Sequence, residues 1–293
     1  MTTKTYIGGG RNIPSLASSW SPSGAPKPGD TLLMGSGVMN ISGSGLAGDT
    51  VTLQQTPAGK SDFFNLSNQA VLATTTAANA KTNATVNVDG HATASLGQGA
   101  ASTANYTVNL HAGSTLAGRY DMSAGGALNV EGQTGATFQN DAASRNDGTT
   151  AVINADVVGT GSFTVGLTSS RPGFLEFGKG VAKTETVNLQ GAPARGKASL
   201  TIDHPADFHA AVNMSWGTID LKNLSSGSYS YHNDVLSLFQ NNKVVETLSI
   251  RNMPAGNAEG AVVPLSVERH GADILISSGP KAYATDSTLF NRG

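Results

Sequence analysis

The amino-acid sequence predicts an all-β protein, a right-handed parallel β-helix (a solenoid of stacked coils) with a C-terminal β-hairpin module as its cap. Three observations support this prediction. A short strand motif recurs five times between Thr85 and Gly191, and repeats at intervals of about 20–50 residues are typical of solenoids. The 3.6-residue period of a helix is nowhere sustained. Blocks of Val, Ile, Leu and Thr alternate with Gly-rich corners, as in short strands joined by tight turns.

The recurring motif is an apolar residue, Asn, an apolar residue and a polar residue, usually followed by Gly. Its Asn residues are Asn87, Asn109, Asn129, Asn154 and Asn188; the first three are 22 and 20 residues apart, and the last two follow after 25 and 34. In a parallel β-helix each strand pairs with its counterpart one coil later, about 4.8 Å away. The Asn side chains then either form a hydrogen-bonded ladder or lie exposed on strand faces. Their alternation with apolar residues favours the exposed position.

The composition excludes several functional classes. The 293-residue chain has 36 Gly, no Cys, 13% charged residues and a net charge of −2. The absence of Cys excludes disulfides, thiolate catalysis and Cys-ligated metals. No basic stripe could displace counterions from phosphates, so we expect no nucleic-acid partner. No apolar run is long enough to span a membrane. The N-terminus lacks the apolar region of a signal peptide, which leaves the export route open.

We expect residues 1–30 to be an N-terminal arm rich in proline and glycine, because proline cannot donate to a central strand ladder. Residues 31–225 are expected to form the β-helix, with roughly nine coils if each takes about 21 residues. Within this span, Gln69–Ala80 predicts a short helix or a lateral loop, and the run of threonines at 74–76 favours the loop.

The last part of the chain changes character. Asp234–Phe239, the turn at Asn241-Asn242 and Val244–Ile250 predict one β-hairpin. A second is predicted from Val262–Glu268 and Asp273–Ile276. Residues 226–278 therefore form a hairpin module that can close the open end of a parallel solenoid, and residues 279–293 are a tail.

The two ends of such a solenoid carry unpaired N–H and C=O groups, which are a template for another chain. The segment Thr2–Ile7 has strand propensity and precedes three glycines, so it could add a strand to a neighbouring subunit. Trp20 is expected to fold back as an apolar plug over the first coil. The candidate assembly residues are Thr3, Thr5, Tyr6, Ile7 and Trp20.

The segment Trp20–Leu53, with its Trp, its prolines and Gly-Asp-Thr at both 29–31 and 48–50, resembles bacterial cell-surface β-helix proteins, as does Thr85–Val165. The family is that of autotransporter passengers and filamentous-haemagglutinin-like adhesins. The resemblance lies in composition and repeat style over about 200 residues. It implies an extracellular or surface-attached role in adhesion, matrix or fibre building. No catalytic residue carries over, and the signal peptide and translocator of that family are not visible in the sequence.

The sequence contains none of the motifs of serine hydrolases, zinc proteases, nucleotide-binding loops or Ca²⁺-binding β-rolls. We therefore expect no enzymatic activity, no catalytic residue, no cofactor and no metal. One constellation is a candidate cation site: Asp89, His111 and Glu131 each follow an Asn strand at the same point, so consecutive coils would stack them about 5 Å apart. The alternative, which we favour, is that they are polar residues leading into turns.

A second constellation is Asp141, Arg145 and Asp147. Polysaccharide-degrading β-helix enzymes use clustered carboxylates and basic residues on one face, but this cluster lies in an Asn- and Gly-rich stretch without an evident partner. The leading hypothesis is therefore an extracellular structural protein, secreted or on the cell surface, that builds surface fibres or an adhesive biofilm matrix by end-to-end self-association. The alternatives are a glycan-binding or tail-spike-like module, with surface glycans as partners, and a polysaccharide-degrading enzyme.

Overall fold

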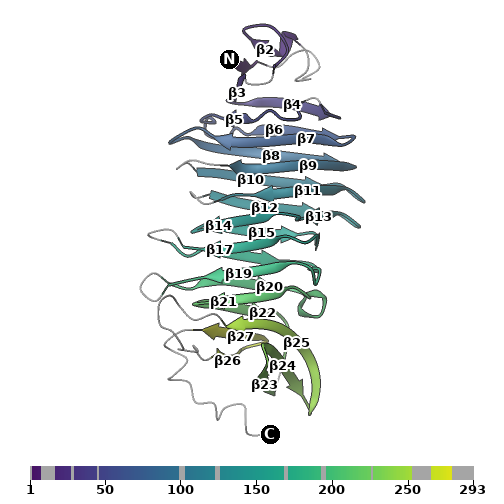
Figure 1. Cartoon of the computed structure of the whole chain (residues 1–293), viewed down its shortest axis with the longest axis vertical. Coiled ribbons are helices and arrows are strands. Elements are labelled where there is room, and N and C mark those ends of the chain that lie inside the picture. The colour runs from purple at the N-terminus through teal and green to yellow at the C-terminus, as the bar shows by residue number, and fades with distance from the viewer. Residues whose placement is uncertain are drawn as a thin grey trace. The chain divides into compact units, whose positions relative to one another are not determined.

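The computed structural model describes residues 2–7, 17–27, 30–44, 46–98, 103–122, 126–167, 171–192, 196–225, 227–252 and 265–278. The protein is nearly all β, with 65% of the described residues in strands and parallel coils stacked into a β-solenoid of about eight turns (Figure 1). The predicted fold class is confirmed. The chain divides into two compact units, Met1–Ala142 with Asn154–Asp156, and Ala143–Ile153 with Val157–Gly293.

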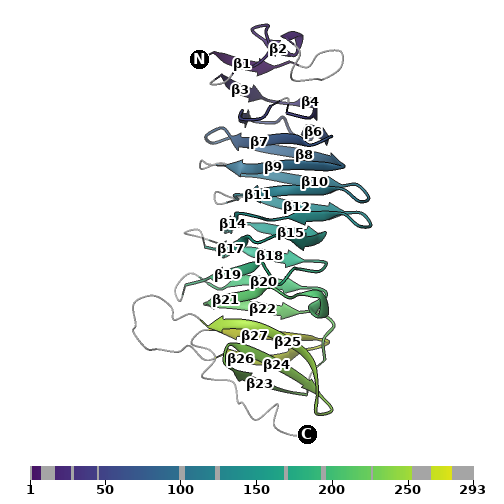
Figure 2. The same cartoon turned by 45° about the vertical axis from the view of Figure 1, so that its right-hand side comes forward.

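Unit 1 is a two-sided solenoid in which each coil contributes one strand to each of two sheets (Figure 2). Neighbouring strands run parallel except β1 and β2, which are antiparallel. Within unit 1, sheet A includes, in spatial order, β2 (Trp20–Ser21), β1 (Thr3–Tyr6), β3 (Thr31–Met34), β5 (Val51–Leu53), β7 (Ala70–Thr76), β9 (His91–Gln98), β11 (Thr115–Tyr120) and β13 (Thr137–Gln139). The strands of sheet B within unit 1 are β4 (Gly37–Ser42), β6 (Asp62–Ser67), β8 (Lys81–Asp89), β10 (Thr103–Leu110) and β12 (Gly126–Gly132).

The strands of unit 1 alternate between inward apolar and outward polar side chains. In sheet B, Val108 pairs with Val86 on one side and with Val130 on the other, so like residues stack in columns inside the solenoid. All three are essentially inaccessible to solvent. Burying one such side chain stabilises the fold by about 1.5–3 kcal/mol. The same alternation places the Asn and Thr residues between them on the outer face.

The segment Gln69–Ala80 is neither a helix nor a lateral loop, so that prediction was wrong. Residues Ala70–Thr76 form β7, a regular strand of sheet A. Its inward side chains are Ala70, Leu72, Thr74 and Thr76, all buried. The threonines that disfavour helix suit a strand, because a β-branched side chain packs well on a pleated surface.

The N-terminal end of unit 1 is closed by part of the segment that we expected to be an arm. Strand β1 pairs in parallel with β3, and β2 pairs with β1. Trp20 is buried and its ring meets that of Tyr6 edge-on, with 5.3 Å between centroids. The Tyr6 hydroxyl donates to the Val38 carbonyl oxygen at 2.8 Å. The Lys4 ammonium donates to the backbone carbonyl oxygens of two loop residues, at 3.2 and 3.0 Å. Gly8–Gly10 and Pro28–Gly29 lie outside the described residues.

Unit 2 places strands along two sides and single bridges along a third. One set of successive parallel strands is β14 (Ala143–Asp147), β17 (Ser162–Gly166), β19 (Thr186–Gln190) and β21 (Ala211–Ser215). The other is β15 (Thr150–Asn154, whose last residue belongs to unit 1), β18 (Phe174–Phe177), β20 (Ala198–Ile202) and β22 (Gly217–Leu221). On the third side, Val157 of β16 (Asp156–Val158) bridges to Val181, which bridges to Phe208. Phe163, Phe177 and Phe208 pack inside these coils, with successive ring centroids 5.2 and 6.0 Å apart.

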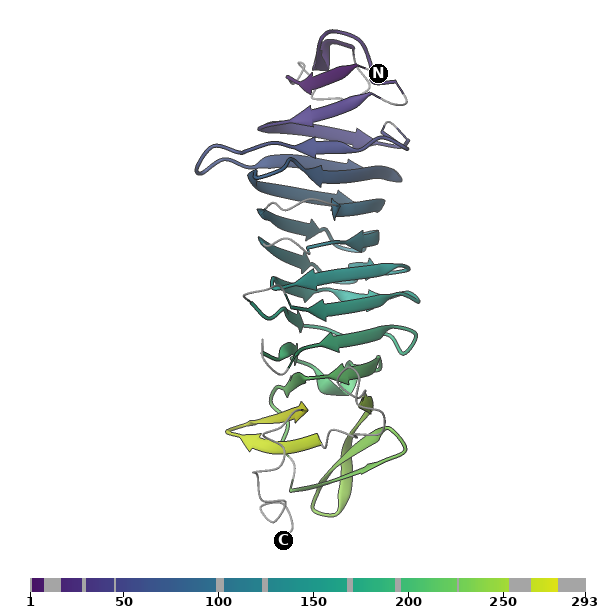
Figure 3. The same ribbon diagram turned by 60° about the vertical axis from the view of Figure 1, so that its left-hand side comes forward.

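The C-terminal hairpins lie in unit 2 and include the predicted segments that the structure describes (Figure 3). Strands β26 (Leu265–His270) and β27 (Asp273–Ser278) form one hairpin, and β27 pairs antiparallel with β22. Strands β23 (Ser228–His232), β24 (Val235–Gln240) and β25 (Lys243–Asn252) form an antiparallel sheet whose β25 pairs in parallel with β21. Residues 262–264 and 279–293 of the predicted hairpin and tail lie outside the described residues. No helix in the described part of the chain is long and apolar enough to cross a membrane.

Candidate functional site

The most regular surface feature is a ladder of Asn side chains on the outer face of sheet B. Asn65, Asn87 and Asn109 each donate a side-chain N–H to the amide oxygen of the preceding Asn, beginning at Asn40, over 2.7, 2.8 and 2.8 Å. The four side chains are half-buried. The residues therefore face outward, as their alternation with apolar residues predicts, and also form the ladder that was the alternative. Each bond contributes about 0.5–1.5 kcal/mol net.

The ladder does not continue to Asn129, because sheet B advances by 22 residues per coil from β6 to β12. Asn129 pairs instead with Thr107, and Glu131 takes the position next to Asn109. The Glu131 carboxylate accepts hydrogen bonds from Asn129 Nδ2 at 3.1 Å and from Asn154 Nδ2 at 3.2 and 3.3 Å. A carboxylate thus replaces an amide at this coil.

This register separates the residues of the proposed cation column. Glu131 lies beside Asn109 and not in line with Asp89 and His111, which follow the paired residues Val88 and Leu110. Within the described ranges, no group of three or more His, Cys, Asp or Glu side chains could hold a metal ion. The stacking prediction for Asp89, His111 and Glu131 was wrong. It assumed that Asn129 lies next to Asn109, whereas Glu131 takes that position.

Asn188 belongs to a separate ladder in unit 2. It lies on β19, between Thr164 of β17 and Asn213 of β21. Asn213 Nδ2 donates to Asn188 Oδ1 at 2.9 Å. Asn154, the preceding copy of the motif, lies on β15 in the other set of strands. The 34-residue interval therefore connects strands on different sides of the coil.

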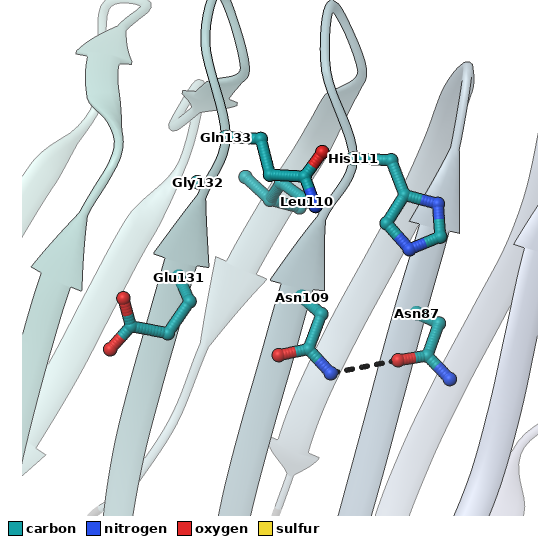
Figure 4. A pocket seen from close by; sticks show the side chains of 7 residues that line it. All are labelled: Asn87, Asn109, Leu110, His111, Glu131, Gly132 and Gln133. Atoms are coloured by element: carbon teal, nitrogen blue, oxygen red, sulfur yellow. Dashed lines mark hydrogen bonds between the residues drawn. The ribbon is translucent and has the colours of Figure 1, made fainter.

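A shallow open hollow of about 360 Å³ lies at the C-terminal end of the sheet B ladder (Figure 4). In the figure, the Asn109 amide nitrogen points to Asn87 and its oxygen lies on the side of Glu131. Asn109 Oδ1 receives no hydrogen bond from any residue that the structure describes. Asn109 Oδ1 and the Glu131 carboxylate are thus two acceptors that line one hollow. The hollow is lined by Asn87, Asn109, Leu110, His111, Glu131, Gly132 and Gln133.

Beside the Asn ladder runs a second outward column. Phe63, Thr85, Thr107 and Asn129 are paired in that order on β6, β8, β10 and β12. The Phe63 side chain is 39% exposed, one of the few large apolar side chains on the described surface. Beyond this column, Asn105 Nδ2 donates to Asn83 Oδ1 at 3.0 Å. The outer face of β6, β8, β10 and β12, which we call the ladder face, is a grid of amides and hydroxyls with one aromatic ring.

The cluster at residues 141–147 is held in local pairs. Arg145 Nε bonds Asp147 Oδ2 at 2.5 Å within the single strand β14. The Asp147 side chain is buried and the Arg145 side chain is exposed. Asp141 Oδ2 accepts from Gln139 Nε2 at 2.5 Å, and it belongs to unit 1 whereas Asp147 belongs to unit 2. These contacts do not join the three residues into one cluster.

The five candidate assembly residues have different environments. Tyr6 and Trp20 are buried in the N-terminal cap. Thr5 is half-buried and pairs with Leu33 and Ser21 of its own chain. Thr3 is exposed, and Ile7 is 60% exposed directly after β1. A role of these residues in association remains a prediction.

A buried polar cluster inside unit 1 was not predicted from the sequence. Asp62 is fully buried and accepts a hydrogen bond from the Thr82 hydroxyl at 3.5 Å. Burial raises its pKa to about 6, against the smaller opposing effects of hydrogen bonds from the Ser36 backbone and Thr82. The Tyr106 hydroxyl lies 2.9 Å from that of Thr74, and burial raises its pKa. The available signal was the alternation of Asp62 with Phe64 and Leu66, which places Asp62 inward.

In comparisons of this chain with known proteins, no protein-family model, no curated protein and no solved structure matches it.

Proposed function

We propose that the protein is a structural component of a bacterial cell surface or extracellular matrix, and that it acts in adhesion through the side of its solenoid. The observation that carries this proposal is the ladder face, on which Asn side chains recur on four successive strands beside Thr85, Thr107 and the single aromatic residue Phe63. A β-solenoid is consistent with surface or adhesive roles. A repeated face can bind a repeated ligand at several points, so that weak contacts add to a strong attachment.

The same proposal treats the chain as non-catalytic. The buried Asp147 is paired with Arg145, and the Glu131 carboxylate is held by Asn129 and Asn154 at an open hollow. These contacts suit structure and ligand binding. The export route of the protein to the surface is part of the proposal and needs its own demonstration.

End-to-end fibre formation is a second candidate function. Ile7, exposed at the end of β1, is an apolar contact that a neighbouring subunit could cover. In the chain itself, β1 pairs with β3, and β27 pairs with β22. A fibre would therefore form either by contact of intact caps or by displacement of these strands. Electron microscopy and sedimentation of the purified full chain test this candidate; a monomer at high concentration would contradict it.

The main proposal is tested in the organism that encodes the chain. Antibody labelling of intact, unpermeabilised cells should detect the protein outside the cell. Deletion of its gene should reduce attachment of cells to a surface or loosen their matrix, and the wild-type gene should restore it. Detection only inside permeabilised cells, or unchanged attachment and matrix after deletion, would overturn the proposal.

A further inference from the structure

We propose that the ladder face binds a neutral polysaccharide, with Phe63 as the platform for a sugar ring and the hollow at Asn109 and Glu131 as the acceptor for sugar hydroxyls. This inference rests on the proposed adhesive function and specifies the ligand. It adds a chemical class and a location that the fold alone does not give.

The polarity of the face fits a ligand rich in hydroxyl groups. A side-chain amide has two N–H groups and an oxygen with two lone pairs. Asn65 and Asn87 each use one N–H and one lone pair within the ladder. Each amide therefore keeps one donor and one acceptor, the combination that a sugar hydroxyl complements. The hydroxyl of Thr107 in the adjacent column adds a further donor and acceptor, and that of Thr85, which lies 3.3 Å from the Ser61 hydroxyl, keeps part of its bonding capacity.

Phe63 gives the second, independent indication of a ligand. An apolar ring of this size is normally buried, but Phe63 is 39% exposed on the outer face of β6. It lies two residues before Asn65 on the same strand and pairs with Thr85. The face of an aromatic ring is slightly negative and attracts the slightly positive C–H groups of a sugar ring. A ring flanked by an amide and a hydroxyl can therefore stack a sugar and bond its edge.

The hollow at the other end of the ladder offers an acceptor to a ligand. Asn109 Oδ1 accepts no hydrogen bond from the described residues, whereas the Glu131 carboxylate beside it already accepts from Asn129 and Asn154. The exposed His111 lines the same hollow. A sugar hydroxyl can therefore donate to Asn109 Oδ1, with further polar groups around it. Three strand spacings separate β6 from β12, or roughly 14 Å, so one short stretch of polymer can contact both ends.

The charge of the face argues against other macromolecules. Its charged side chains are Lys81 and Asp89 at the two ends of β8, and Glu131 on β12. This set carries no excess of positive charge, which nucleic acids and anionic polysaccharides require. The strands of the face are paired on both sides, so a peptide cannot add to them as an extra strand. Phe63 alone offers too little apolar area for a stable protein interface.

The test is affinity gel electrophoresis of the purified full chain in gels that contain neutral glucans, mannans or galactans, with alginate as the anionic comparison. We expect at least one neutral polysaccharide to retard the protein and alginate to have no effect. Phe63→Ala removes the platform, and Thr107→Arg places a long side chain across the centre of the face. Each should weaken the apparent affinity about tenfold or more, as the loss of about 1.4 kcal/mol of binding energy would.

Two variants serve as matched controls. Thr93→Arg makes the same change at an exposed threonine on β9, in sheet A of the same unit. Val244→Ala removes another exposed apolar side chain, 54% accessible, on β25. Both should bind within about twofold of the wild type, a difference of about 0.4 kcal/mol. Circular dichroism confirms that every variant is folded.

No retardation by any neutral polysaccharide, retardation by alginate alone, or equal losses in Thr107→Arg and Thr93→Arg would overturn the inference. These outcomes are separable from failure of the proposed function. If the protein is on the cell surface and its deletion reduces attachment, but no neutral polysaccharide retards it, the ligand assignment alone fails. If it binds polysaccharide in the gel but remains inside the cell, the proposed function fails and the binding face stands.

Discussion

Replacing Asp62 by Asn should make the protein more stable at neutral pH. Asp62 begins β6 with its side chain inside the solenoid, fully buried. Its Oδ2 accepts a hydrogen bond from the Thr82 hydroxyl at 3.5 Å, and the Ser36 backbone contributes a second, but these bonds do not offset the effect of burial on the carboxyl group. An ionised carboxylate is costly in such a place. Asn has nearly the same shape and carries no charge at any pH.

The size of the effect follows from the pKa of Asp62. Burial raises it from 3.8 to about 6, a difference of about two pKa units, and each unit is worth about 1.4 kcal/mol. The folded state therefore prefers the protonated form by up to about 3 kcal/mol. Because the folded pKa lies above the unfolded one, this stabilisation is complete below about pH 4 and is lost as the pH rises through about 6. The amide that replaces the carboxyl group does not titrate, so D62N should match the wild type near pH 4 and exceed it above pH 6.

Urea unfolding followed by circular dichroism between about pH 4 and pH 8 measures this difference. Burial also raises the pKa values of Glu176 and Glu246, but both proteins carry these residues and the comparison cancels their contribution. Asp89→Asn, which removes an exposed carboxylate from β8, is the control and should change stability by no more than about 0.5 kcal/mol. A D62N protein that is less stable than the wild type at pH 8, or a difference that does not change with pH, would refute the reasoning.

Three further predictions concern the solenoid and its cap. Asn87→Ala removes two hydrogen bonds of the Asn ladder and should lower the free energy of unfolding by about 1–3 kcal/mol. Asn105→Ala removes one exposed hydrogen bond and should lower it by less than about 1 kcal/mol. Urea unfolding of both variants measures the difference. Gly118→Ala would place a Cβ atom 1.8 Å from a backbone oxygen and should lower the free energy of unfolding by more than about 3 kcal/mol. Gly113 has open space around it at φ +68°, so Gly113→Ala should lower it by only about 1–2 kcal/mol. Similar melting temperatures for the two variants would contradict this geometry. Trp20→Ala removes a buried ring from the N-terminal cap and should destabilise the cap by about 3–5 kcal/mol. Amide hydrogen exchange should therefore accelerate in β1 and β3 but not in β10. An equal acceleration in both regions would contradict a local role of the cap.

The sequence predicted the fold class well because the inside–outside alternation is written into every strand. It predicted the Asn ladder less well, and Asn129 shows why. A shift of two residues keeps each apolar side chain inward and each polar side chain outward, so the pattern alone cannot distinguish Asn129 from Glu131 as the neighbour of Asn109. The observed register pairs Tyr106 with Leu128 and Val108 with Val130. The packing of these inward side chains decides the alignment.

Features that depend on contacts between coils were the hardest to predict. Asn188 looks like a member of the first ladder until the strands of unit 2 place it opposite Asn213. The exposure of Phe63 follows from its outward position on β6, but its place beside Asn65 and Thr85 requires the pairing of β6 with β8. Neighbours across these coils are 22 residues apart in the chain, and no local pattern specifies them.

The constant spacing of the sheet B coils also has an evolutionary consequence. From β6 to β12, equivalent positions recur every 22 residues. An in-frame deletion or duplication of one such period within this region would therefore join two coils that already present matching surfaces to each other. Recombination between such segments could change the number of coils without creating a new interface in the core. The length of the stack of coils and the number of repeats on the ladder face could then evolve together, by the gain or loss of whole coils.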